Sequence, residues 1–461
     1  MKKTIAQDFY NDPRIEEAKQ LIAQTVQEHA SKITQVKPAD DELKQSYEKT
    51  LEDFSQKRGG KLYYDYLGSG IGNGALVELA DGSVKYDFIT GIGVHYFGHS
   101  HPEVIKAQVH GAVSNTTMSG NLQQNIDSPK LFNLILEQAN KYGAGFDHLF
   151  MTSSGVMAAE NSLKMVFQKR SPAYRVLAFE KCFMGRTLSV SQITDKAAYR
   201  KGLPHTLSVD YLPFYDANDH QGSIDRVLKR LKEYFQRYPD QYAAICMELI
   251  QGEGGYWVGN TEFFQAIIKE CKKHNVSVIV DEVQSFMRTK EMFAFQYFGL
   301  DQNVDLVNIG KNSQVCATIY RNDHKPQPGL ISQTFTSSGS AISAAYYMIN
   351  EVASNGFLGE EGKIEKLHQY FAQKLNRLHE KYPQIIEGPW GVGAMIGLTM
   401  FKGDLAKSKE FTFKLFNNGV IGFIAGMAPT RVRFLIPAGV ATTKDIDQVS
   451  KIIEDTIKEM I

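Results

Sequence analysis

Two stretches of the sequence decide the fold, VSVIVDEVQ (276–284) and VDLVNIGK (304–311). Each begins with a short apolar, β-branched run, and each is followed at once by a charged residue, Asp281 in the first and Lys311 in the second. Short runs of this kind, alternating with helical patterns, predict βαβ units and a parallel sheet. Ligands of such sheets bind beyond the carboxyl ends of the strands, so Asp281 and Lys311 are candidate site residues.

The same pattern extends to both sides of these two stretches. Further β-type runs are HLFMT (148–152), RVLAF (175–179) and AAICMELI (243–250). After residue 345 the pattern is mainly helical, with IEKLHQYFAQKLNRLHEKY as one long amphipathic helix and Thr442 and Asp445 spaced as a capping box. We therefore predict an α/β fold with a mostly parallel sheet flanked by helices, plus a smaller α+β domain. The expected divisions are a helical arm at 1–60, the first part of the small domain at 61–100, the large domain at 101–344 and the C-terminal small domain at 345–461.

Composition narrows the class of protein. The 461 residues include 51 Lys and Arg and 51 Asp and Glu, and 43% of the chain is hydrophobic. This apolar content excludes an intrinsically disordered chain, and the zero net charge argues against a dedicated nucleic-acid binder. We expect a small-molecule partner or a second copy of the chain.

Targeting signals are not visible in the sequence. The N-terminal stretch has no apolar segment typical of a signal peptide, and no run approaches the ~18 apolar residues of a membrane span. The four cysteines form no CxxC pattern, and Cys182 and Cys246, which lie in or beside apolar runs, are interpreted as buried inert thiols. We expect a cytoplasmic enzyme.

Four positions after the strands carry polar or catalytic groups. SSGVMAAENSLK (153–164) runs from a strand into a helix, whose first N–H groups either hold a phosphate or form a plain turn. Asp281 needs a cation, which could be a metal, an arginine or a protonated ring nitrogen, unless it only caps a helix. Lys311 is either a solvated lysine or a buried amine that forms Schiff bases. Arg186 in FMGRT either binds a substrate carboxylate or has an internal partner. Together these groups suggest a pyridoxal 5'-phosphate site.

His95, His99 and His101 have metal-like spacing in GVHYFGHSHP. No carboxylate cluster lies close to them in the sequence, so we expect no metal site.

The chain resembles the class III (omega-amino) aminotransferases, which are fold-type-I pyridoxal-phosphate enzymes. Within that family, GVMAAENSLK and GKNSQVCA are most similar to the L-lysine 6-aminotransferases. The resemblance spans about residues 65 to 455. It rests on these segments, which occur in the family's order: DGSVKYDFITGIGVHYFGHSHPEVIKA, GVMAAENSLK, CFMGRT, ELIQGEGG, VDEVQ, DLVNIGK, QTF and RVRFLIP.

The resemblance implies a role for each matching cofactor position. Lys311 would form the Schiff base and shuttle the proton, and Asp281 would keep the pyridine nitrogen protonated. The remaining cofactor contacts would come from Phe183 stacking on the ring, Gln284 near its phenolic oxygen, the backbone N–H groups of Gly155 and Val156 on the phosphate, and Thr334 reaching the phosphate of a neighbouring subunit.

The resemblance also implies how substrates are held. Arg186 would bind the distal carboxylate, Glu253 would pair with Arg186 and shield it, and Arg433 would bind the α-carboxylate of glutamate or 2-oxoglutarate. One pocket could then serve both half-reactions, in a homodimer with its sites at the subunit interface.

Four positions depart from the family pattern. Val156 stands where many members have Ser or Thr, and Met184 stands where His or Trp is frequent. SFMRTK (285–290) and TSS (336–338) lack the usual glycines. The expected function is transfer of an ω-amino group from an amino acid such as L-lysine to 2-oxoglutarate, giving a semialdehyde and glutamate by a ping-pong mechanism. The alternatives are 4-aminobutyrate, ornithine or acetylornithine as donor, a racemase, mutase or decarboxylase on the same fold, and a non-catalytic or nucleotide-driven protein.

Overall fold

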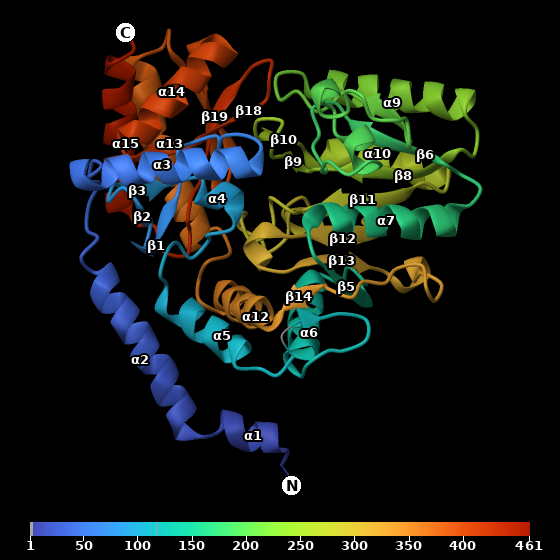
Figure 1. Ribbon diagram of the computed structural model, residues 1–461. Helices are drawn as coiled ribbons and strands as arrows, with labels where there is room; N and C mark the ends of the chain where they lie inside the picture. The colour runs from blue at the N-terminus through green and yellow to red at the C-terminus, as the bar shows by residue number, and fades with distance from the viewer. Residues whose placement is uncertain (1–2, 117) are drawn as a thin grey trace.

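A central sheet of seven strands organises the computed structural model, which describes residues 3–116 and 118–461 (Figure 1). Its neighbouring pairs are parallel except for those of β13, which runs antiparallel to β12 and to β5. The mostly parallel sheet expected from the sequence is confirmed. In spatial order the strands are β5 (His148–Thr152), β13 (Cys316–Tyr320), β12 (Leu306–Ile309), β11 (Ser277–Asp281), β8 (Tyr242–Met247), β6 (Arg175–Phe179) and β7 (Ser208–Leu212).

One predicted strand is shorter than expected. The run AAICMELI does not continue to its end, because β8 stops at Met247 and β9 (Ile250–Gln251) pairs instead with β10 (Trp257–Val258). The break falls at Glu248, whose buried carboxylate accepts hydrogen bonds from the N–H groups of Phe183 and Gly252. The side chain of Glu248 thus ties the end of β8 to the segments that carry Phe183 and Gly252.

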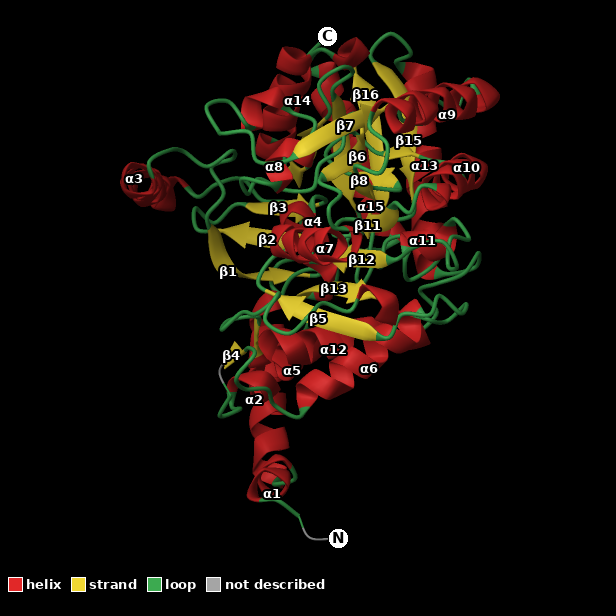
Figure 2. Cartoon of the chain, turned by 90° about the vertical axis from the view of Figure 1, so that its right-hand side faces the viewer, coloured by secondary structure: helices red, strands yellow, loops and turns green. Residues whose placement is uncertain are grey.

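Helices cover the central sheet (Figure 2). Helix α7 packs against β12 and β13, while α9 and α10 pack together beside β7 and β11. These helices are long and amphipathic, and their apolar residues join the buried core. The helices of this region are α5 (Pro102–Ala112), α6 (Asp127–Ala139), α7 (Gly155–Arg170), α8 (Val190–Ile193), α9 (His220–Arg237), α10 (Thr261–Lys273), α11 (Ala294–Tyr297) and α12 (Gly339–Ser354).

Two smaller sheets bring distant parts of the chain together. The strand at Val84–Asp87 pairs in parallel with Val420–Ile421, so residues before 100 and after 345 share one sheet. The sheets have the orders β1-β2-β3-β17 and β15-β16-β19-β18. Their strands are β1 (Gly68–Asn73), β2 (Leu76–Leu79), β3 (Val84–Asp87), β15 (Ile386–Val392), β16 (Met395–Met400), β17 (Val420–Ile421), β18 (Phe423–Ala425) and β19 (Arg431–Leu435).

Helices α13 (Lys363–Lys381), α14 (Leu405–Asn417) and α15 (Thr443–Lys458) pack beside these sheets. Helix α13 coincides with the long amphipathic helix predicted from the sequence. The capping box at Thr442 and Asp445 is confirmed, since the Thr442 hydroxyl accepts from the Asp445 N–H and the Asp445 carboxylate accepts from the Thr442 N–H. The exact domain boundaries stay a prediction.

The N-terminal arm is helical, as expected, and comprises α1 (Ile5–Tyr10), α2 (Pro13–Ala30) and α3 (Asp41–Arg58). Helix α3 ends at Gly59, which adopts a left-handed conformation. Figure 1 shows α1 and α2 projecting from the body, with α2 packed beside α5. Among the described residues, no helix has both the length and the apolar character that crossing a bilayer requires.

Candidate active site

Asp281 and Lys311 lie at the ends of neighbouring strands. The parallel pairing of β11 with β12 sets Asp281 beside Asn308, and the chain reaches Lys311 just after β12 ends. Asp281 is buried, and its Oδ1 accepts a hydrogen bond of 3.0 Å from the Val283 N–H. The sheet edge therefore brings together the two residues that the sequence singled out.

Burial shifts the pKa of both groups toward neutrality. Desolvation raises the pKa of Asp281 to about 7, against the opposing effect of the nearby Lys311 charge. Desolvation lowers the pKa of the Lys311 amine to about 8, and the charges facing it are Glu253, Arg433, Arg288 and Asp281. A lysine with a pKa near 8 has a substantial fraction of free amine at neutral pH, as a nucleophilic lysine requires.

Helix α7 begins at Gly155, within the stretch 153–164 that was predicted to run from a strand into a helix, and its N-terminus lies at the same edge of the sheet. Ser154 caps the helix through its Oγ, which accepts a hydrogen bond of 3.3 Å from the Met157 N–H. A Cβ added to Gly155 would lie 2.8 Å from both methyl carbons of Val283, so only glycine lets this turn approach β11. The N–H groups of Gly155 and Val156 stand in the first turn, where intrahelical partners are lacking.

Phe183 and Gln284 are held by buried polar groups. The Phe183 N–H donates to Glu248 at 2.7 Å, and Glu248 also accepts from the Gly252 N–H at 3.0 Å. Burial raises the pKa of Glu248 to about 8. Gln284 is buried and its Oε1 accepts from Arg433 at 3.0 Å. Glu248 was not predicted as a site residue, although it begins the quoted motif ELIQGEGG.

The expected pairing of Glu253 with Arg186 is wrong. Glu253 instead forms an ion pair with Nη2 of Arg433, whose side chain is fully buried, while Glu253 is 26% exposed. Burial pushes the pKa of Glu253 up, but the charges of Arg433 and Lys311 outweigh it and hold the pKa below its ordinary value. The physical reason is the cost of burying an unpaired charge: pairing with Glu253 stabilises the buried Arg433 guanidinium, whereas water already solvates the exposed Arg186 guanidinium.

Arg186 is exposed, and its guanidinium stacks over the ring of Tyr199 at 3.9 Å. Near it lies a cavity of ≈170 Å³ that Phe183, Tyr199 and Glu253 line. The other residues around this cavity include Lys181, Lys196, Asp195, Gly254, Gly426 and Met427. The lining carries two lysines, Lys181 and Lys196, and two carboxylates, Asp195 and Glu253. The Arg186 guanidinium over Tyr199 adds a cation beside the cavity that could bind a substrate carboxylate.

Thr334 is exposed. Its loop packs on the 118–124 segment, where the Asn121 N–H donates to the Gln333 carbonyl at 3.0 Å and the Thr336 N–H donates to the Ser119 carbonyl at 2.8 Å. The neighbouring Gln333 accepts a hydrogen bond of 2.7 Å from the Thr152 hydroxyl, so this loop also contacts the end of β5 that precedes Gly155.

The three histidines of the GVHYFGHSHP stretch do not converge on a common point. His99 hydrogen-bonds to Asp87 at 3.1 Å, and Nδ1 of His101 caps α5 by accepting from the Val104 N–H at 3.4 Å. No cluster of three or more metal-ligating side chains occurs in residues 3–116 and 118–461.

The donor set fits pyridoxal phosphate. The buried carboxylate of Asp281 has a raised pKa, as expected for a group that lacks a close cationic partner. The Lys311 amine, with a lowered pKa, lies near it, and helix α7 presents unpaired N–H groups at the same edge of the sheet. Asp281 would hold the ring nitrogen, Lys311 the aldehyde carbon, and Gly155 and Val156 the phosphate.

Comparisons with known proteins agree with this geometry. A family model described as "Aminotransferase class-III" matches residues 69–457. An acetylornithine aminotransferase from Caldanaerobacter subterraneus subsp. tengcongensis is 27% identical over 399 residues, covering 84% of this chain and 94% of that protein. A diaminobutyrate–2-oxoglutarate transaminase from Wolinella succinogenes is 26% identical over 395 residues, covering 84% and 91%.

Among solved structures, lysine aminotransferase from M. tuberculosis superposes with a TM-score of 0.78 at 20% identity, covering 89% of this chain and 100% of that one. The fold is therefore shared with a protein of the type that the sequence motifs resemble. Since the family model spans most of the sequence, the chain belongs to the class III aminotransferases and is a pyridoxal-phosphate-dependent enzyme of fold type I.

Proposed function

We propose that this enzyme moves the terminal amino group of L-lysine to 2-oxoglutarate, giving a semialdehyde and glutamate by a ping-pong mechanism. The observation that carries the proposal is the ion pair between Glu253 and the fully buried Arg433 at the mouth of the Lys311 site. A buried cation with a partly exposed partner suits an enzyme whose two substrates differ by one carboxylate.

The residues divide the chemistry as follows. When bound, the cofactor supplies an aldehyde for the substrate amine and a ring that accepts electrons. Asp281 holds a proton on the ring nitrogen by supplying a buried negative charge. The Nζ of Lys311 would hold the aldehyde carbon of the cofactor and, when released from it, would carry a proton. Phe183 and Gln284 orient the ring, and the N–H groups of Gly155 and Val156 bind the phosphate.

The Glu253–Arg433 pair explains two substrates in one pocket. With lysine as donor, the reacting amine is far from the only carboxylate, and Glu253 keeps the Arg433 charge covered. With glutamate or 2-oxoglutarate, a carboxylate lies next to the reacting carbon and displaces Glu253 from Arg433. The second carboxylate, or the lysine carboxylate, binds Arg186 at the edge of the cavity near Tyr199.

Lysine is the first choice of donor because GVMAAENSLK and GKNSQVCA resemble lysine 6-aminotransferases. Acetylornithine is the second, since acetylornithine aminotransferases recur among the similar proteins. The two donors differ at the α-nitrogen, which is a cation in lysine and a neutral amide in acetylornithine. Ornithine, 4-aminobutyrate and a racemase or mutase reaction remain alternatives to be tested.

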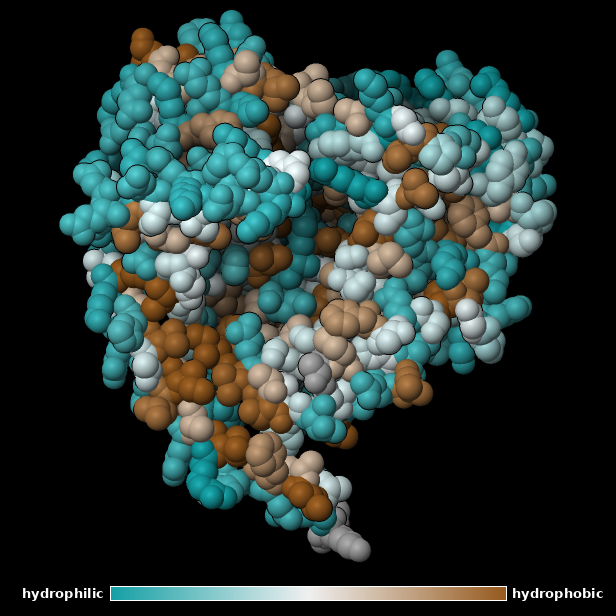
Figure 3. Space-filling model, in the orientation of Figure 1, coloured by the Kyte–Doolittle hydropathy of each residue, from teal (hydrophilic) through white to brown (hydrophobic). Residues whose placement is uncertain are grey.

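A homodimer would complete the site. Thr334 is exposed beside Phe335, which is 57% exposed, and the adjoining segment carries Leu122 and Ile126 at 98% and 71%. Exposed apolar side chains that gather on one surface, here formed by the Thr334 loop and the adjoining 118–126 segment, are typical of a protein interface. Apolar areas are also visible on the face shown in Figure 3. We propose that this surface meets a second copy and that Thr334 contacts the partner's phosphate.

The decisive experiment adds single amino donors to the purified enzyme with bound cofactor and no 2-oxoglutarate. A transaminase converts the bound cofactor to its amine form with one equivalent of donor, and 2-oxoglutarate then restores it. Lysine should react with the highest kcat/KM of a panel containing acetylornithine, ornithine and 4-aminobutyrate. Lys311→Ala should abolish the conversion. A donor that turns over without converting the cofactor would identify a racemase or mutase, and a different preferred donor would reject lysine.

A further inference from the structure

Two strained turns meet beside the Lys311 side chain. The four residues Thr90–Gly93 all have positive φ, of 52°, 63°, 61° and 97° in order, and the second turn has φ values of 54° at Lys311 and 57° at Gln314. Left-handed conformations cost roughly 1–2 kcal/mol for each residue other than glycine. Such strain persists only where surrounding contacts hold it, and it concentrates at functional sites.

The side chain of Arg288 connects the two turns. Its Nη2 donates to the Gly93 carbonyl at 2.9 Å and to Oδ1 of Asn312 at 2.8 Å. Asn312 in turn donates to the Phe286 carbonyl at 3.1 Å, which ties the second turn back to the Arg288 segment.

The contact at Gly93 is too close for any side chain. An added Cβ would lie 2.9 Å from Nη2 of Arg288 and 3.4 Å from Cδ of Lys311. Gly93 thus lies in close contact with both the Arg288 guanidinium and the aliphatic part of the Lys311 side chain. A shift of Arg288 would free the lysine stem to move.

Arg288 is an unusual residue to bury. Its side chain is fully buried, and no carboxylate pairs with it in the described part of the chain. Its Nε and Nη1 have no hydrogen-bond partner there either. Burying an unpaired cation is costly, and an apolar residue would fill the same space without that cost. Stability alone therefore does not account for an arginine at this position.

We propose that Arg288 is a positioning residue for Lys311: its guanidinium locks the Thr90–Gly93 turn to the Lys311–Gln314 turn and fixes the lysine stem in the site. The proposal rests on the proposed function, in which Lys311 is the reacting amine. Arg288 touches neither substrate nor cofactor in this role. Its positive charge also acts on Lys311 together with that of Arg433, against the negative charges of Glu253 and Asp281, and favours the neutral amine.

The test measures Lys311 in the full, cofactor-free chain, so that it does not depend on turnover. Lysines are labelled with trace acetic anhydride across pH 6 to 11, and labelling at Lys311 is quantified by mass spectrometry. Arg288→Gln should raise the midpoint of Lys311 labelling by about half a pH unit or more, a roughly threefold change in the free amine. Arg288→Lys, which keeps the charge, should move the midpoint less.

Arg170→Gln is the matched control. It removes one partly buried arginine from the opposite edge of the same sheet, where Arg170 donates to Ser277 at 2.9 Å. It should leave the Lys311 midpoint unchanged. An unchanged midpoint in folded Arg288→Gln, or an equal shift in Arg170→Gln, overturns the proposal.

Asn312→Ala separates position from charge. It breaks the bridge to Arg288 while keeping the guanidinium, so kcat of both half-reactions should fall about tenfold with little change in KM or in the labelling midpoint. Unchanged rates in Asn312→Ala would overturn the positioning role of Arg288. This test remains decisive even if Arg288→Gln fails to fold. If the wild-type enzyme transfers no amino group but the midpoint still shifts in Arg288→Gln, the proposed function fails and the effect of Arg288 on Lys311 stands.

Discussion

Glu253 accepts a hydrogen bond from Nη2 of Arg433, a residue 180 positions later in the chain. The two are brought together because β19, which carries Arg433, lies beside the loop that follows β9. Arg433 also donates to the Gly252 carbonyl at 3.1 Å and to Gln284 at 3.0 Å. The guanidinium therefore joins the C-terminal small sheet to the cofactor end of the central sheet.

Replacing Glu253 with glutamine should change substrate preference rather than abolish activity. The amide keeps the shape but leaves the Arg433 charge uncompensated, so a donor with no carboxylate near its reacting amine meets an exposed cation. We expect kcat/KM of the ω-amine half-reaction to fall at least tenfold, or about 1.4 kcal/mol. The glutamate half-reaction should stay within about threefold. Stopped-flow absorbance of the bound cofactor measures both, with the exposed Glu262→Gln as control. Equal losses would contradict the assigned role.

Arg433→Ala should have the opposite selectivity. The variant removes the cation that binds the α-carboxylate of glutamate or 2-oxoglutarate, so this half-reaction should suffer far more than the ω-amine half-reaction. Removing one partner of a buried ion pair typically costs ~3–5 kcal/mol of stability. The double variant Arg433→Met with Glu253→Gln should recover part of that stability in urea unfolding. A similar loss in both half-reactions would reject the role of Arg433.

Asp281→Asn should stabilise the cofactor-free enzyme above neutral pH while preventing catalysis. The folded state raises the pKa of Asp281 from 3.8 to about 7, so the native carboxyl holds its proton more tightly than the unfolded one. Stability contributed by this group is full below pH ~4 and is lost as pH rises to 7. We expect Asp281→Asn to gain on the order of 1–4 kcal/mol at pH 8 and little at pH 4. Urea unfolding at both pH values checks this, and a gain that does not depend on pH would disprove it.

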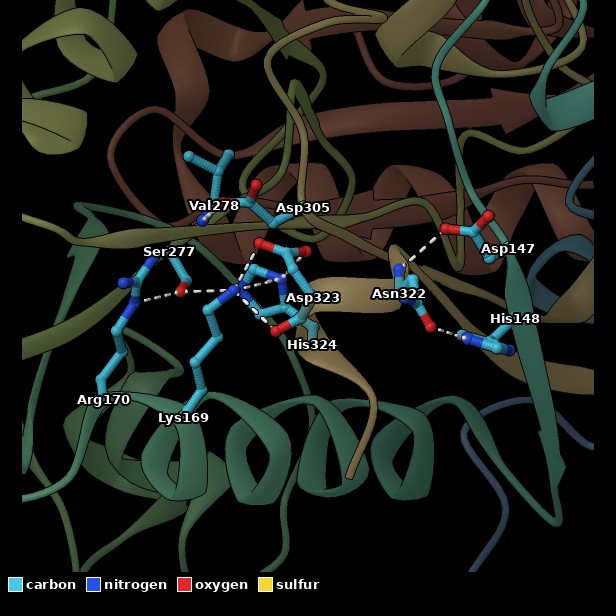
Figure 4. Close-up of polar contacts among 10 residues, drawn as sticks. All are labelled: Asp147, His148, Lys169, Arg170, Ser277, Val278, Asp305, Asn322, Asp323 and His324. Atoms are coloured by element: carbon cyan, nitrogen blue, oxygen red, sulfur yellow. Dashed lines mark hydrogen bonds and ion pairs between the residues drawn. The ribbon is translucent and has the colours of Figure 1, made fainter. Parts of the chain in front are cut away.

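His324 should make the enzyme less stable in mild acid. Figure 4 shows it at the far edge of the central sheet, between Asp323 and Ser277, with Lys169 and Arg170 reaching in from α7. Its Nδ1 lies 2.9 Å from Asp323 and its Nε2 2.9 Å from Ser277. Burial lowers the pKa of His324 below 6.5, against the attraction of the nearby carboxylates.

The unfolded chain therefore binds the His324 proton first, and stability falls as pH drops below about 6.5. His324→Gln should flatten the loss of melting temperature between pH 7 and pH 5, whereas the exposed His29→Gln should not. An unchanged slope of melting temperature against pH in His324→Gln would show that other groups cause the loss.

The hydrogen-bonded series Ser277–His324–Asp323 has the connectivity of a hydrolase triad. However, Ser277 is fully buried and its hydroxyl accepts a hydrogen bond from Arg170, so no substrate reaches it.

Much of the site could be predicted because it follows local rules. Asp281, Lys311 and Gly155 each come within three residues of the end of a β-type run, and the ends of such strands gather at one edge of the sheet. The antiparallel strand β13 and the edge strand β7 were not predicted. CATIY (316–320) and SVDYL (208–212) are short and have no distinctive flanking pattern, so their pairing depends on neighbours that only the folded sheet supplies.

The partner of Glu253 could not be predicted, since ion pairing depends on which guanidinium is buried. The sequence does not indicate which of Arg186 and Arg433 is buried. In the structure Arg186 stacks on Tyr199 at the surface, whereas the Arg433 side chain is fully buried. The position of Arg288 was missed for the same reason: its contacts with Gly93 and Asn312 join segments 195 and 24 residues away.

By itself the sequence determined the strand and helix pattern, the cofactor chemistry and the family. These features depend on hydrophobic periodicity and on the residues at strand ends, which are properties of residues close together in the sequence. Only the tertiary structure decided which charges neutralise one another and how Lys311 is held. Those features depend on burial, and burial arises only when distant segments pack together.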